Sequence, residues 1–133
     1  TVDAAGKVTV KGPGVAKITV KAAATTDYKA ASKTVTVTVA PKKQGISLVN
    51  KIKKQLTIKW KKNTKASGYQ VVYSTNKKFT GKKTVRKAKT TTSYKIKGLK
   101  KGKKYYVKVR SYKTVNGKRI YGAYSTVKKA TIK

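Results

Sequence analysis

Cysteine and histidine are absent from this chain of 133 residues, and only two residues carry a carboxylate side chain. Without cysteine, no disulfide framework can form. The two carboxylates are Asp3 and Asp27, so the chain from Tyr28 onward offers no acidic side chain for general acid–base catalysis or a Ser–His–Asp triad. A Ser–Lys dyad is formally possible, but among so many lysines a close pair would arise by chance. The sequence therefore predicts a protein that is not an enzyme.

Metal and cofactor sites are disfavoured on similar grounds. Zinc prefers cysteine and histidine, and calcium prefers several oxygen ligands that include carboxylates. The run Gly81-Lys82-Lys83-Thr84 superficially resembles a phosphate-binding loop, but it lacks the glycine-rich lead-in and no helix is predicted after it. A basic hairpin turn is the simpler interpretation, and we expect no metal and no cofactor.

Long apolar runs and targeting segments are missing as well. No stretch approaches the length of a membrane span, and no signal peptide is recognisable at the N-terminus. The chain starts at Thr1 without a methionine, which is typical of a mature or excised piece of a larger protein. It also lacks an amphipathic helix or apolar anchor, which argues against a cationic toxin acting on membranes, so no membrane insertion is expected.

What the sequence does contain is positive charge. Lysine and arginine number 36, which gives a formal net charge of +34. A chain of high net charge and few apolar residues is usually disordered. Here, however, 38% of the residues are hydrophobic and they are arranged with a clear period. A folded protein whose field attracts polyanions is therefore the better interpretation.

Alternation of apolar and polar residues with a period of two dominates the sequence and predicts β-strands. Turn signals such as Asn116-Gly117 separate these stretches, and no helical stripe is present. A short linker is predicted around Ala40–Gly45, where a basic polar run after the preceding strand has nothing to bury. The alternating stretches are Val8–Val10, Ile18–Val20, Val35–Val39, Leu56–Trp60, Tyr69–Tyr73 and Tyr105–Val109.

Residues 42–133 resemble a fibronectin type III domain of the kind common on surface proteins of Gram-positive bacteria. Leu56–Trp60 is similar to strand B with its buried tryptophan, and Ser67–Ser74 is similar to strand C. Leu99–Tyr105 resembles the turn between strands E and F, with Tyr105 as the corner tyrosine, and Tyr106–Tyr112 resembles strand F. The resemblance implies an Ig-like β-sandwich and a secreted or cell-surface location in a bacterium.

Residues 1–41 resemble the C-terminal half of a bacterial group 2 Ig-like domain, on the stretches Val2–Thr9, Gly14–Val20 and Thr34–Val39. The expected fold class is thus all-β: an Ig-like/fibronectin type III β-sandwich preceded by a partial Ig-like β-sandwich. A partial sandwich exposes sheet edges and an apolar face. We therefore expect residues 1–41 either to pair with a strand of another chain or to pack against the following domain.

Lysine clusters mark the candidate binding surface. A solvated charged surface normally carries both signs, and here the acids are missing, which favours binding of polyanions. If Tyr105, Val107 and Val109 point inward, the residues between them share the outer face of one strand, with Tyr121 and Tyr124 beside them. The alternative is that these tyrosines simply cover the sheet. The candidate polyanion-binding residues are Lys82, Lys83, Arg86, Lys87, Tyr106, Lys108, Arg110, Tyr112 and Arg119.

The leading hypothesis is a non-enzymatic module of a bacterial surface or secreted protein that binds an anionic polymer. Wall teichoic acid, acidic glycans and extracellular nucleic acid are the candidate ligands. Lysine lacks the bidentate geometry used in base readout, so nucleic acid binding in vitro should be non-specific. The alternative is a structural spacer in a surface stalk with no ligand of its own, and salt dependence separates the two.

Overall fold

The computed structural model describes residues 1–133, and every regular element in it is a β-strand. It contains no helix with the length and apolar character needed to cross a bilayer. The all-β prediction is therefore confirmed. The strands are β1 (Gly14–Ala22), β2 (Ala31–Val39), β3 (Ile46–Val49), β4 (Leu56–Trp60), β5 (Gly68–Ser74), β6 (Lys83–Ala88), β7 (Ser93–Ile96), β8 (Lys104–Val115), β9 (Lys118–Tyr121) and β10 (Lys128–Thr131).

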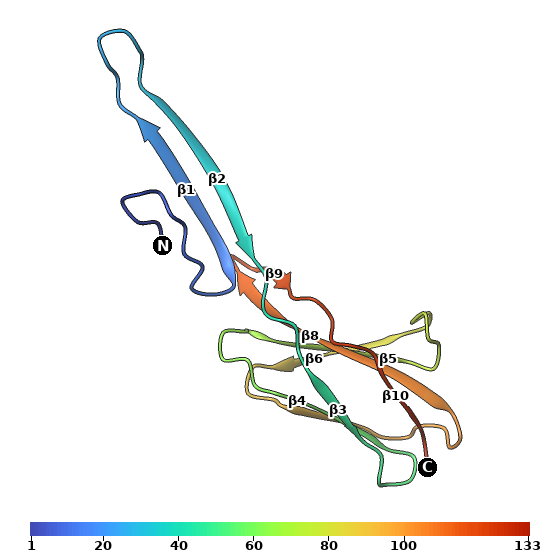
Figure 1. Cartoon of the computed structure of the whole chain (residues 1–133). Coiled ribbons are helices and arrows are strands. Elements are labelled where there is room, and N and C mark those ends of the chain that lie inside the picture. The colour runs from blue at the N-terminus through green and yellow to red at the C-terminus, as the bar shows by residue number, and fades with distance from the viewer.

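Strands β3 to β10 form a two-layer sandwich (Figure 1). One sheet has the order β3-β4-β7, and the other has the order β10-β8-β5-β6, with β9 paired to β8. All the pairings are antiparallel. Two antiparallel sheets packed over one core are the Ig-like sandwich that the sequence predicts.

Alternating residues of both sheets fill the core. Leu56, Ile58 and Trp60 of β4 meet side chains of β5 and β8, and the Trp60 ring lies 5.4 Å from the Tyr69 ring at a tilt of 54°. Strand β5 is buried along its whole length, although it belongs to a sheet with an outer face. Other groups therefore cover that outer face, and they belong to the candidate site described below.

The sharp turn between β8 and β9 follows directly from its sequence. Asn116 and Gly117 both have positive φ, at 48° and 73°. A two-residue hairpin with positive φ at both positions matches the right-handed twist of its strands. The predicted Asn-Gly hairpin is thus present.

The prediction that the linker around Ala40–Gly45 buries nothing is wrong. Pro41 and Gln44 are buried. The Gln44 amide donates a hydrogen bond to the hydroxyl of Ser111 (3.3 Å), and that hydroxyl donates to the carbonyl of Lys42 (3.2 Å). A side chain at Gly122 would collide with the Pro41 carbonyl. The connector is thus fixed against the end of the sandwich, because its amide and proline find partners on β8 and the segment after β9.

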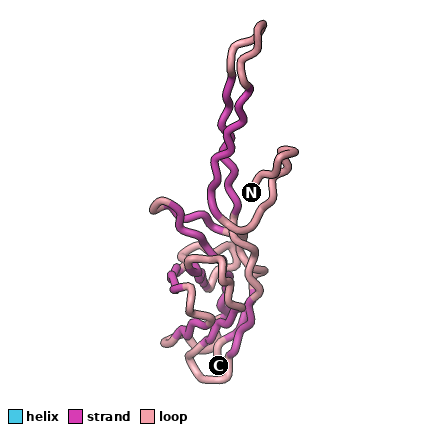
Figure 2. The backbone as a smooth tube through the Cα atoms, turned by 90° about the vertical axis from the view of Figure 1, so that its left-hand side faces the viewer, coloured by secondary structure: helices cyan, strands magenta, loops and turns pink.

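Strands β1 and β2 pair in register from Gly14↔Val39 to Ala22↔Ala31 and form a two-stranded ribbon. The ribbon extends away from the sandwich and contacts it only near its base (Figures 1 and 2). Ile18 and Val35 lie opposite each other on one face, and Val35 is 48% exposed. Packing of residues 1–41 against the sandwich, one of the two expected arrangements, is therefore not seen. The division of the chain at residues 41 and 42 stays a prediction.

The predicted strand at Val8–Val10 does not form. Val8 makes a single bridge to Val2, and the backbone between them turns because the Asp3 carboxylate accepts hydrogen bonds from the amides of Ala5 and Lys7. A strand requires a neighbour to complete its backbone hydrogen bonds. Residues 1–12 lie beside the base of the ribbon, but their backbone–backbone hydrogen bonds join only residues of this segment, so alternation alone does not make them a strand.

Candidate functional site

The candidate site lies on the outer face of the larger sheet. Along β8, Val107, Val109 and Ser111 are fully buried and the residues between them are only partly buried. Since successive side chains of a strand point to opposite faces, the intervening residues share the outer face. The structure thereby brings four of the candidate residues into one row, namely Tyr106, Lys108, Arg110 and Tyr112.

Cations and aromatic rings alternate above this row. The Nζ of Lys108 lies 4.1 Å from the ring centre of Phe79 and 4.3 Å from that of Tyr124. The Cζ of Arg110 lies 4.3 Å from the Tyr124 ring and 3.8 Å from the Tyr121 ring. Each cation is therefore placed between two rings, at distances where the ring quadrupole attracts it. We refer to these five residues as the aromatic–cation stack.

Hydrogen bonds fix the middle of the stack. The Nε of Arg110 donates to the side-chain oxygen of Gln70 (2.7 Å), and the Tyr124 hydroxyl donates to the same oxygen (3.1 Å). Gln70 lies on the outer face of β5 and is buried beneath these two side chains. Because arginine has five N–H donors and Nε uses only one, the terminal nitrogens of Arg110 can bind an anion without losing this contact.

The stack continues toward the β8–β9 hairpin. The Tyr112 and Tyr121 rings meet edge to face at 5.7 Å, and the Cζ of Arg119 lies 5.5 Å from the Tyr112 ring. On the other side, Arg86 of β6 lies opposite Gln70, which in turn lies opposite Arg110. Both Arg86 and Arg119 are exposed. The outer face thus has a fixed aromatic centre and an exposed arginine at each side.

The remaining candidate residues do not join this surface. Lys83 and Lys87 lie opposite the inward-pointing Tyr73 and Tyr69, so they border the inner face of the sheet. The Nζ of Lys87 lies 4.2 Å from the Tyr94 ring of the facing sheet, where it covers the edge of the core. Lys82 lies in the turn before β6. The cluster Lys82–Lys87 is therefore split by strand alternation, with only Arg86 on the outer face.

Tyr73 is the one group whose ionisation is clearly perturbed. Burial raises the pKa of its hydroxyl, and Tyr94 and Tyr105 raise this pKa further. The hydroxyl therefore stays protonated over the physiological range, and Tyr73 acts as a core residue.

Comparison with known protein families identifies the family of this domain. The sequence matches the fibronectin type III domain over residues 39–127, which is more than half of the chain. The chain belongs to the fibronectin type III family. Domains of this family are generally non-catalytic structural or binding modules. No curated protein matches the chain in sequence.

Solved structures show the same fibronectin type III fold. The FN1–FN3 domains of chicken CNTN1 are similar with a TM-score of 0.60 and 19% identity, over 77% of this chain and 37% of that one. The chain therefore spans little more than a third of that structure. A structure described as a myokine is similar with a TM-score of 0.55 and 15% identity, over 70% of this chain and 98% of the other. At these identities the likeness concerns the fold alone.

The start of the family match agrees with the packing of the fibronectin type III domain, whereas its end at residue 127 leaves out β10, which pairs with β8. The match begins at Val39, so it includes the connector with its buried Pro41 and leaves β1 outside. Tyr105, predicted as the corner tyrosine, lies at the start of β8, and the amide of Lys100 points to its hydroxyl at 3.5 Å. Neither Phe79 nor Gln70 is recognisable as a site residue from the sequence. Phe79 has a φ of 61° in a loop, outside any alternating pattern, and the role of Gln70 depends on strand register.

Proposed function

We propose that this fibronectin type III domain binds anionic polymers as a non-enzymatic module of a bacterial surface or secreted protein. The observation that carries the proposal is the imbalance of 36 cationic side chains against two carboxylates, both of which lie before residue 39. No cation of the family-matched segment has an acidic side chain within that segment to neutralise it. A field of one sign raises the local concentration of polyanions and speeds their association. Wall teichoic acid, acidic glycans and extracellular nucleic acid share the required charge.

The outer face of the larger sheet offers a defined binding surface in addition to the overall positive charge. The aromatic–cation stack holds Lys108 and Arg110 in place, so a bound anion does not have to order these two side chains. Exposed Arg86 and Arg119 lie on either side and are free to reach a polymer that crosses the strands. The rings also offer surfaces on which sugars or bases could stack.

A structural spacer is the second candidate function. Val72 is fully buried on the outer face of β5, and Phe79 is only 7% exposed, so the aromatic–cation stack also serves as packing. In a spacer, the aromatic–cation stack would serve only to cover the sheet, and the lysines would serve only to keep the domain soluble. Retention of an anionic polymer at physiological salt distinguishes the two functions, and removal of exposed arginines beside the stack locates the interface.

Replacing Arg86 and Arg119 with Gln should weaken binding to heparin or teichoic acid about fivefold at fixed salt, because the lost charges lie at the interface. The matched control is Lys59→Gln with Lys95→Gln, since both lysines are exposed on the outward side of the smaller sheet. Binding is measured by surface plasmon resonance on immobilised polymer. If both pairs weaken binding equally, the outer face is not the interface. If the unaltered chain is not retained on the polymer at physiological salt, the spacer function is favoured.

We further propose that the β1–β2 ribbon pairs with a strand of another polypeptide. A two-stranded ribbon is marginally stable in water, and both of its edges have unpaired backbone groups. Its apolar face, with Ile18 and Val35, has no covering layer apart from residues near its base. Strand addition would complete the edge through main-chain hydrogen bonds. Two copies each carrying +34 repel, so a less basic partner is favoured at low salt.

If the ribbon can pair with another strand, self-association of the protein should depend on salt concentration. The intact chain should be monomeric at low salt and should self-associate as salt screens the repulsion, whereas a version beginning at Val39 should stay monomeric throughout. Sedimentation velocity across a salt series measures both. If the intact chain also stays monomeric and hydrogen exchange finds β1 and β2 unprotected, the pairing proposal is wrong.

A further inference from the structure

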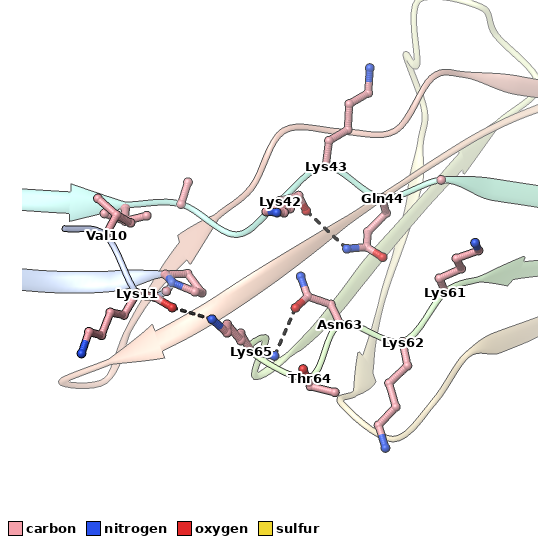
Figure 3. Close-up of a pocket in the computed structure, with 15 residues that line it drawn as sticks. Val10, Lys11, Lys42, Lys43, Gln44, Lys61, Lys62, Asn63, Thr64 and Lys65 are labelled. Carbon is pink, nitrogen blue, oxygen red and sulfur yellow. Dashed lines mark hydrogen bonds between the residues drawn. The ribbon is translucent and has the colours of Figure 1, made fainter.

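A second basic region lies where the ribbon meets the sandwich. A cleft of about 560 Å³ opens there between three segments that are distant in sequence: the end of the N-terminal segment, the connector, and the loop between β4 and β5 (Figure 3). This volume falls within the range of about 300–1,000 Å³ that is usual for small-ligand sites. Six lysines line it, and we call it the junction cleft: Lys11, Lys42, Lys43, Lys61, Lys62 and Lys65.

The lysines of the junction cleft have no acidic neighbour. No carboxylate lies among the fifteen lining residues. In Figure 3 the side chains of Lys43 and Lys62 extend away from each other into solvent, whereas Lys65 reaches back to the carbonyl of Lys11. Six lysines that line one cavity without a carboxylate among them repel one another electrostatically, most strongly at low salt. A multivalent anion in the cleft would remove this repulsion.

The remaining lining residues indicate what kind of anion fits. Gln44, Asn63 and Thr64 bring polar side chains, and the cleft contains no aromatic ring. Binding of single-stranded nucleic acid without sequence preference combines a charged groove with base stacking on aromatic rings, and this lining supplies no ring. Lysine acts as a mobile point charge and binds phosphate without the planar geometry that favours arginine for carboxylates. A flexible chain of closely spaced phosphate groups without bases is the best match.

We propose that the junction cleft binds a short run of phosphate groups and, in doing so, fixes the ribbon relative to the sandwich. The proposal rests on polyanion binding as the function of the domain and assigns a particular site and ligand chemistry to it. Lysines from both sides of the junction contribute, because Lys11 precedes β1 and Lys61, Lys62 and Lys65 belong to the sandwich. An anion between them therefore draws the two parts together.

Tripolyphosphate is a suitable probe, because it carries several charges yet is too short to span the protein. The triple variant Lys42→Gln, Lys61→Gln, Lys62→Gln should weaken its binding about tenfold or more in calorimetric titration, since each lost ammonium contact lowers affinity severalfold. The control triple variant, Lys77→Gln, Lys95→Gln and Lys101→Gln, removes the same charge at exposed positions outside the cleft and should change binding by about twofold or less. Equal weakening in both variants would overturn the proposal.

A second measurement tests the fixing of the ribbon. The chain has no cysteine, so Ala24→Cys in the loop that joins β1 to β2 and Thr80→Cys on the sandwich accept spin labels at unique positions. Tripolyphosphate should narrow the distribution of distances between the labels, and the cleft variant should abolish this effect. A distribution that does not change on saturation would refute the fixing.

The two proposals can fail separately. If heparin or teichoic acid binds but the cleft lysines make no difference to tripolyphosphate binding, the proposed phosphate site in the junction cleft is wrong. The proposal that the domain binds polymers is then unaffected. If tripolyphosphate binds in the cleft but no polymer is retained at physiological salt, polymer binding by the domain is wrong.

Discussion

Affinity for a phosphate-rich polymer should fall at least about a thousandfold between roughly 50 and 200 mM salt, as it does when six or more phosphate contacts displace condensed counterions. The reason is the excess of 36 cations over two acids, which leaves electrostatics as the main source of affinity. A plot of log K against log salt, measured on teichoic acid or heparin, should be linear and steep. Its slope reports the number of ion contacts made.

Two further results bear on this expectation. Neutral dextran of similar length should not bind at any salt concentration, which controls for sugar stacking on the half-buried rings of the outer face. An affinity that stays flat over the salt range would contradict the electrostatic mechanism and would favour a shaped pocket. Self-association through the ribbon should have the opposite sign, strengthening with salt, so one salt series separates the two processes.

Trp60→Ala should lower the free energy of unfolding by about 3–5 kcal/mol, as large-to-small changes in a core do. Trp60 is only 6% exposed, and its ring packs against Tyr69 between the two sheets. Loss of the ring leaves a cavity that Leu56 and Ile58, on the same strand, cannot fill. Urea denaturation of the chain measures the effect as a shift of the midpoint at constant m-value.

Trp60→Phe is the matched control and should cost much less. The indole nitrogen of Trp60 is buried without a hydrogen-bond acceptor, so phenylalanine removes an unsatisfied donor while it keeps an aromatic ring. If Trp60→Ala changes the unfolding free energy by less than about 1 kcal/mol, the tryptophan does not belong to the cooperative core.

Strands β4, β5 and β8 of the sandwich could be predicted from sequence because their signal is local. The alternation in Leu56–Trp60 and Tyr105–Val109 survives in the structure, since each stretch has neighbours on both sides and a core to face. Val8–Val10 has the same alternation but no neighbouring strand, so the identical signal gave the wrong result. Alternation shows which residues share a face only after a sheet exists to define that face.

The candidate site was predictable only in part, for the same reason. Period two correctly places Lys108 and Arg110 together, because they lie on one strand. The contribution of Phe79 depends on a loop with positive φ, and that of Gln70 depends on the register of β5 against β8. The junction cleft combines segments centred near residues 11, 43 and 63. A local sequence pattern cannot indicate that segments so far apart in the chain lie together.

The register of the ribbon has a mechanical consequence. Gly14 and Val39 lie opposite each other at its base, where the chain enters β1 and leaves β2. Tension on the chain at these two points would load the hydrogen bonds one pair at a time, as in a zipper, rather than all together in shear. The ribbon should therefore open at low force while the sandwich, with its buried core, stays intact. Its opening would release roughly 90 Å of extended chain, at about 3.4 Å per residue. Under load, the ribbon would unfold and lengthen the chain before the force on the sandwich becomes high enough to unfold it.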